Sequence, residues 1–136
     1  LLAPHELAGL QFVRPFEQKL ITGLMGAGAK VRLHICGNTR RILDGMGKTG
    51  ADIVDMDYPS PLNEARAQMG PAQVLLGNIH PVKVLKDGTA EMVETAIAEC
   101  HQQSGGNYIV GAGCEVPRGT PHENLLALVR YAKSHC

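Results

Sequence analysis

Residues 30–36 of this 136-residue chain, KVRLHIC, give the strongest indication of its fold. Side chains alternate across a β-strand, so one face of this stretch carries Val31, Leu33 and Ile35. The opposite face carries Arg32, His34 and Cys36. The pattern predicts a strand with one face packed against a core and one face that carries chemically active groups.

Outward from this stretch, short β-branched runs alternate with amphipathic segments. Strands are predicted at 30–36, 51–57, 74–76 and 108–110, and helices at 4–25, 39–48, 62–69, 89–103 and 120–134, with Pro15 kinking or splitting the first helix. Such alternation predicts a parallel sheet with right-handed crossovers. Four units make half of a (β/α)8 barrel, which needs about 250 residues. An open four-stranded sandwich is the alternative, but the polar face of the first strand favours the lined interior of a half barrel.

Composition excludes several classes of function. Lysine plus arginine and aspartate plus glutamate each number 13, so no net charge attracts nucleic acid. Hydrophobic residues make up 44%, and no apolar run approaches the roughly 18 residues that span a membrane. Residues 1–10 show no export signal, so we expect a cytoplasmic protein whose four cysteines stay reduced or bind metal. We expect one domain, 1–136, that is a fragment of a longer chain.

Several polar residues follow the predicted strands at their carboxyl ends, where ligands gather in barrels. His34 and Cys36 end the first strand, and Cys114 follows the fourth. One imidazole and two thiolates suit a catalytic zinc site with an open fourth position. The alternative interpretation, two buried thiols and a core histidine, is equally compatible with the pattern.

Other residues near the same end have both functional and structural interpretations. Asn78 and His80 follow the third strand and are candidates for ligand contact or for turn formation. Arg32 is expected to pair with Asp55 on the adjacent strand. The backbone amides of residues 37–39 could bind a small anion at a helix start. Cys100 lies on the apolar stripe of its helix and is expected to be a core thiol.

The chain resembles a known family in several motifs. These are LHICGNT at 33–39, GAD at 50–52, GN at 77–78, GC at 113–114 and TPHEN at 120–124. The motifs are similar to those of corrinoid:thiol methyltransferases of the uroporphyrinogen decarboxylase superfamily. The resemblance implies zinc on His34, Cys36 and Cys114, a methylated corrinoid protein as partner, and a small thiol acceptor such as coenzyme M. It also implies a full (β/α)8 barrel whose first half is missing here.

Two residues depart from the pattern of the methyltransferases, and two alternative functions remain to be compared. Asp57 stands where the methyltransferases have a glutamate near the metal, and Glu115 replaces a glycine of the coenzyme M enzymes, so both are catalytic candidates. Uroporphyrinogen decarboxylases lack the His-x-Cys pair and carry histidine in place of Cys114, which disfavours a metal-free decarboxylase. A non-catalytic fragment is the third possibility, since the open edges of a half barrel predict self-association or pairing with the missing half.

Overall fold

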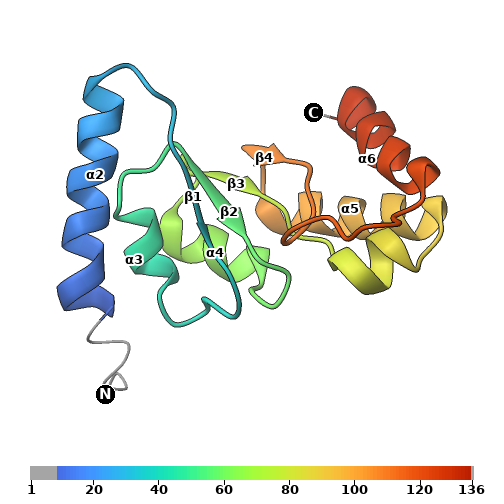
Figure 1. Cartoon of the computed structure of the whole chain (residues 1–136), viewed down its shortest axis with the longest axis horizontal. Helices are drawn as coiled ribbons and strands as arrows, with labels where there is room; N and C mark the ends of the chain where they lie inside the picture. The colour runs from blue at the N-terminus through green and yellow to red at the C-terminus, as the bar shows by residue number, and fades with distance from the viewer. Residues whose placement is uncertain (1–8, 136) are drawn as a thin grey trace.

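The computed structural model describes residues 9–135, and its centre is one parallel sheet (Figure 1). The four strands are β1 (Arg32–Ile35), β2 (Ile53–Met56), β3 (Val74–Leu76) and β4 (Tyr108–Ile109), and they lie side by side in chain order. An open doubly wound sheet reverses its strand order at a switch point, whereas a barrel keeps the order of the chain. The predicted fold, part of a (β/α)8 barrel, is therefore confirmed over the open sandwich.

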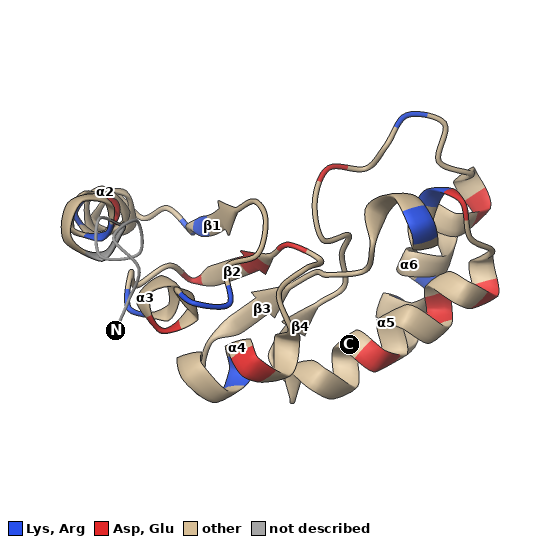
Figure 2. Ribbon diagram, turned by 90° about the horizontal axis from the view of Figure 1, so that it is seen from below, with Lys and Arg blue, Asp and Glu red and all other residues tan. Residues whose placement is uncertain are grey.

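Helices follow the strands, as the sequence predicts. They are α3 (Leu43–Gly47), α4 (Leu62–Met69), α5 (Ala90–Ser104) and α6 (His122–His135). Figure 2 shows α3, α4 and α5 on the same side of the sheet. The opposite face carries Arg32, His34 and Asp55 of β1 and β2, and apolar residues such as Leu76 and Ile109 continue the same face on β3 and β4. None of the helices among residues 9–135 is long and apolar enough to cross a membrane.

The alternation of residues 30–36 separates the core from the site. Leu33 and Ile35 of β1 pack against the core cluster, which includes the fully buried Val54, Met56 and Leu75 of β2 and β3. These side chains lie under the helices because apolar area is removed from water there. The odd-numbered and even-numbered positions of the first strand therefore have separate roles, as predicted.

Two helical segments differ from the sequence prediction. The helix expected at 39–48 is reduced to α3, because Thr39 is buried and bonded through its backbone amide and hydroxyl to the Ser60 hydroxyl. The segment after His80, where neither a helix nor a strand was predicted, forms a short π-helix, η2 (Pro81–Lys86), with Pro81 in its first turn. Both differences come from contacts that a local pattern does not contain.

The first helix is divided near Pro15. A π-helical turn, η1 (Gly9–Val13), precedes α2 (Arg14–Gly26), and the proline sits in the first turn of α2, where its missing amide costs no hydrogen bond. Residues 4–8 of the predicted helix lie outside the described residues. One stripe of this segment is exposed, with Phe16 at 72% and Leu20 at 64%.

Candidate metal centre

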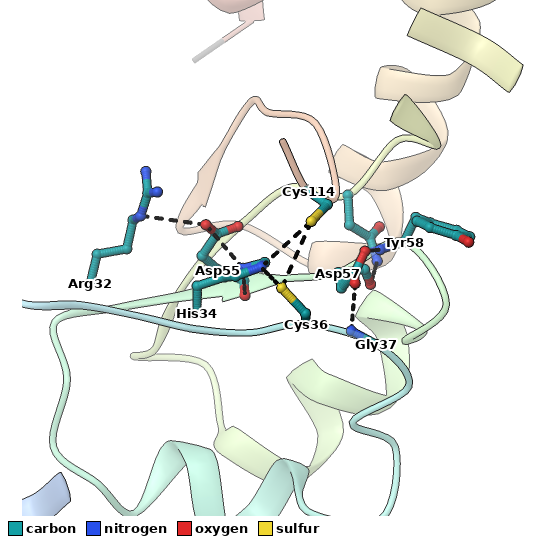
Figure 3. A network of polar contacts seen from close by, with 9 residues as sticks. Arg32, His34, Cys36, Gly37, Asp55, Asp57, Tyr58 and Cys114 are labelled. Carbon is teal, nitrogen blue, oxygen red and sulfur yellow. Dashed lines mark hydrogen bonds and ion pairs between the residues drawn. The ribbon is translucent and has the colours of Figure 1, made fainter. Parts of the chain in front are cut away.

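Three side chains predicted as metal ligands meet at the carboxyl end of the sheet (Figure 3). His34 Nε2 lies 3.2 Å from Cys36 Sγ, and Cys114 Sγ lies 3.9 Å from each of these two atoms. Among residues 9–135 these three residues, which we call the ligand triad, are the group whose ligand atoms all lie within 4.8 Å of one another. The structure therefore brings together residues separated by up to 80 positions.

The spacing of the ligand triad fits a tetrahedral ion. Zinc bonds of about 2.3 Å to sulfur and about 2.0 Å to nitrogen separate tetrahedral ligand atoms by roughly 3.5–3.8 Å. The observed separations of 3.2–3.9 Å bracket that range. One nitrogen and two sulfurs are also the donor types that zinc prefers. The residues present therefore fit a three-ligand site with one position open.

The hydrogen bonds of His34 orient its ring for this role. Nδ1 lies 3.1 Å from the backbone carbonyl oxygen of Asp55, which can only accept a hydrogen bond. With its proton on Nδ1, the neutral ring donates to this carbonyl, and Nε2 keeps a lone pair. That lone pair is on the side of the ring where Cys36 and Cys114 lie.

Asp55 links His34 to Arg32. Its Oδ2 atom lies 3.3 Å from His34 Nδ1 and 3.4 Å from Arg32 Nε, which confirms the predicted ion pair with the arginine. Burial raises the pKa of the Asp55 carboxyl, and the neighbouring His34 and Arg32 oppose that shift. The carboxylate is thus held out of water between two partners that favour its charged form.

The two thiols of the ligand triad influence each other. The hydrogen bond with Cys114 is the main cause that raises the pKa of the Cys36 thiol above its usual range. Desolvation and the charges of Asp57 and Asp55 act in the same direction. A cation bound here must displace protons from sulfur, as at other thiolate sites.

A glycine before Cys114 allows the loop after β4, which carries that ligand, to approach the sheet. A Cβ atom on Gly113 would lie 2.5 Å from the backbone nitrogen of Tyr58, closer than real Cβ atoms come to backbone. The Gly113 amide also donates to the Ile79 carbonyl at 2.8 Å. The loop after β4 therefore passes directly against the loop after β2, and this passage places Cys114 at the ligand triad.

Asp57 and the loop after β1 hold each other in place. The Asp57 carboxylate accepts hydrogen bonds from the backbone amides of Gly37 and Tyr58 and is 5% exposed. The predicted anion site on the amides of residues 37–39 is wrong for two of its amides, because that of Gly37 donates to Asp57 and that of Thr39 to Ser60. Asp57 is not part of the ligand triad, and its predicted catalytic role stays a prediction.

Asn78 is occupied by contacts within the chain. Its side-chain amide donates to the carbonyl oxygens of Asp57 at 3.0 Å and Ser60 at 2.6 Å. Its side-chain oxygen lies 3.6 Å from the Cys100 sulfur, and burial raises the pKa of that thiol. Asn78 thus joins β3 to the loop after β2, which favours the structural interpretation, and Cys100 packs against the core as predicted.

His80 and Glu115 lie on two different loops. His80 Nδ1 accepts from the amides of Val82 and Lys83, so the residue caps η2, and its ring stacks on Tyr58 with centroids 4.1 Å apart. Glu115 is exposed, next to Cys114 in the chain. Neither residue belongs to the ligand triad. Their predicted roles in cofactor contact and catalysis stay predictions.

Sequence reasoning missed two residues that shape the site. It paired Asp55 with Arg32 but not with His34, although His34 and Asp55 are direct register partners on β1 and β2. It gave Gly113 no role, although the glycine is required where the two loops meet. The Gly-Ala-Gly run at 111–113 was the available signal, since glycine in such a position often marks close backbone approach.

Known proteins resemble this chain along almost its whole length. A family model described as uroporphyrinogen decarboxylase (URO-D) matches residues 8–135. The methylcobamide:CoM methyltransferase MtbA of Methanosarcina mazei is 32% identical in an alignment of 137 residues that covers 98% of this chain and 40% of the relative. A methylated-thiol–coenzyme M methyltransferase of the same organism is 37% identical over 123 residues, 90% of this chain and 32% of the relative.

A uroporphyrinogen decarboxylase and a solved structure are also similar. The decarboxylase, from Streptomyces avermitilis, is 32% identical over 121 residues, 88% of this chain and 33% of the relative. A solved methyltransferase from Methanosarcina mazei superposes with a TM-score of 0.84 at 24% identity, covering 98% of this chain and 38% of that one, and so supports the fold. The chain spans 40% or less of the length of these relatives. The family model covers nearly every residue, and the chain therefore belongs to the uroporphyrinogen decarboxylase family.

Proposed function

We propose that this chain carries the zinc site of a methyltransferase that moves a methyl group from a methylated corrinoid protein to a small thiol such as coenzyme M. The observation that supports this proposal is the convergence of His34, Cys36 and Cys114 with ligand atoms 3.2–3.9 Å apart. Two methyltransferases that act with coenzyme M are among the relatives. Because the chain spans 40% or less of their length, the activity is proposed for the protein that contains it.

The residues of the chain have distinct tasks in this proposal. Cys36 and Cys114 supply two thiolates and His34 one neutral nitrogen, while Asp55 holds the imidazole. A zinc ion held by these groups supplies a Lewis acid that favours the thiolate form of an acceptor near neutral pH. In the transfer, the acceptor sulfur attacks the methyl carbon, a carbon–sulfur bond replaces the carbon–cobalt bond, and the corrinoid leaves with the electron pair.

Zinc stoichiometry and methyl transfer test the proposal together. We expect the chain to bind about one zinc per molecule, and Cys114→Ala to lose both zinc and any transfer from methylcobalamin to coenzyme M. Cys100→Ala is the matched control, because it removes a thiol that packs against the core and is not in the ligand triad. Full zinc content and activity in Cys114→Ala would refute the proposal.

A metal-free decarboxylase is the second candidate, because decarboxylases occur among the relatives at similar identity. The ligand triad disfavours it, since two thiols and an imidazole directed at one point are the donor set of a zinc site. A chain that folds fully in the presence of a strong chelator and binds no zinc would favour this candidate.

An assembly role is the third candidate and rests on the exposed stripe of α2 and of the turn before it. Phe12 is 67% exposed and Phe16 72%, and large exposed apolar side chains tend to be covered by a partner. Self-association, or pairing with another half barrel, stays a prediction. Analytical ultracentrifugation tests it, because a monomer at all concentrations would contradict it.

A further inference from the structure

The strand register places a buried carboxylate beside the histidine of the ligand triad. His34 of β1 and Asp55 of β2 are direct partners in the parallel ladder. Partners on neighbouring strands direct their side chains to the same face of the sheet. The Asp55 side chain therefore lies next to the His34 ring on the face that also carries Arg32, as Figure 3 shows.

We propose that Asp55 is a positioning residue that keeps His34 protonated at Nδ1 and holds the Nε2 lone pair toward Cys36 and Cys114. Arg32 anchors the carboxylate in this arrangement. The inference extends the proposed function to the regulation of metal affinity by residues that bind no metal themselves. Its first part, the state of the ring, is independent of whether the protein transfers methyl groups.

Three contacts carry the proposal. The proton on Nδ1 is shared between two acceptors of the same residue, the Asp55 backbone carbonyl at 3.1 Å and its Oδ2 atom at 3.3 Å. Arg32 Nε approaches the same Oδ2 atom at 3.4 Å from the other side. Asp55 is 5% exposed, so water competes little for its oxygens.

The carboxylate matters more than the carbonyl for a chemical reason. A hydrogen bond to a charged acceptor is stronger than one to a neutral acceptor, and it increases the basicity of the opposite ring nitrogen. Partners of this kind typically change metal affinity by about 10- to 100-fold when they are removed. The competing explanation is that the backbone carbonyl alone orients the ring, and it predicts no effect of the side chain.

Nuclear magnetic resonance of the metal-free chain measures the protonation of the His34 ring directly. Long-range proton–nitrogen correlation spectra show which nitrogen of His34 carries the proton. We expect Nδ1 in the unsubstituted chain and a mixture of both forms in Asp55→Ala. Competition with a chelator then measures zinc affinity, which we expect to fall about 10- to 100-fold in Asp55→Ala.

Matched variants keep the result interpretable. Asp52→Ala removes a carboxylate that pairs with Lys30 and lies just before β2, the strand of Asp55. It should change neither the protonation of the His34 ring nor the zinc affinity. Asp55→Asn keeps the side-chain shape and one acceptor oxygen, so we expect the Nδ1 form to persist with a zinc affinity between those of the unsubstituted chain and Asp55→Ala. This variant decides the question if Asp55→Ala does not fold.

Some outcomes overturn the inference and others separate it from the proposed function. The inference would be overturned if Asp55→Ala left both the protonation of the His34 ring and the zinc affinity unchanged. The same result in Asp55→Asn would overturn it where that variant alone folds. A chain that binds no zinc would refute the proposed function, while the spectra of the metal-free chain still decide the positioning role. A chain that binds zinc but transfers no methyl group would refute only the proposed function.

Discussion

At the carboxyl end of the sheet, His34, Cys36 and Cys114 face one another, and the contacts between them are the ones that an ion would replace. At the amino end, Arg66 of α4 donates to the backbone carbonyls of five residues in the segments before β3 and β4, namely Gly70, Gln73, Ser104, Gly106 and Asn107. In barrels, the carboxyl end carries function and the amino end carries stability.

The difference lies in how each group of polar atoms is satisfied. Arg66 supplies donors to carbonyls at the ends of α4 and α5, where helices leave such groups without partners. Its desolvation lowers the pKa of the guanidinium, a cost that the carbonyl contacts offset. The ligand triad instead gathers atoms that can all donate a lone pair. We therefore expect substitutions at the two ends to affect different measured quantities.

The largest expected effect on stability is at the amino end. Arg66→Met should lower the free energy of unfolding by about 3 kcal/mol, because it removes the donors to the partly buried carbonyl contacts at Gly70, Gln73 and Ser104. Zinc affinity of the folded fraction should not change. Urea denaturation and chelator competition measure the two quantities, and a loss of zinc affinity equal to that of Cys114→Ala would remove the distinction between the two ends.

Gly113→Ala tests whether backbone packing supports the carboxyl end. The added Cβ would lie 2.5 Å from the Tyr58 nitrogen, so the loop that carries Cys114 must move. We expect a loss of about 1–3 kcal/mol in the free energy of unfolding and a weaker zinc affinity. Gly23→Ala, in helix α2 with open space around it, is the control that should leave both unchanged or slightly raise stability. Zinc affinity equal to that of the unsubstituted chain would show that Cys114 needs no such approach.

The smallest effect is expected from an exposed pair. Arg40 forms a two-pronged contact with Glu64 of α4, and its hydrogen bond lowers the pKa of the Glu64 carboxyl. A lowered pKa in the folded state adds stability above the unfolded value of about 4.3. That stability is lost as the pH falls through the lower folded value. Glu64→Gln should therefore melt slightly below the unsubstituted chain at pH 7, and the difference should shrink as the pH falls below about 4.3.

Thermal melts at several pH values measure this pair and complete the comparison between the two arginines. Arg40 is largely exposed and Arg66 is partly buried among carbonyls. Exposed pairs contribute little because water screens them. If Glu64→Gln lowered stability as much as Arg66→Met does, burial would not decide how much each arginine contributes to stability.

Much of the fold followed from local patterns. The bounds of α4 and β3 agree with the prediction, because short apolar runs closed by glycine are local signals. The helix predicted at 39–48 was too long. The hydrogen bond that holds Thr39 outside the helix is to Ser60, 21 positions away, and a local pattern does not contain it. The π-helix capped by His80 was missed, because a histidine cap is not a usual start signal.

Local alternation was enough to predict which residues share a face of a strand, because it is a property of the backbone at each residue. It thereby set His34 and Cys36 apart from Leu33 and Ile35. The packing of distant segments brings Cys114, 78 positions beyond Cys36, to 3.9 Å from it. It also places Asp55 against His34, while Asp57 contacts the loop after β1. Those outcomes depend on strand register and on the close passage of two loops, which arise only when distant segments pack together.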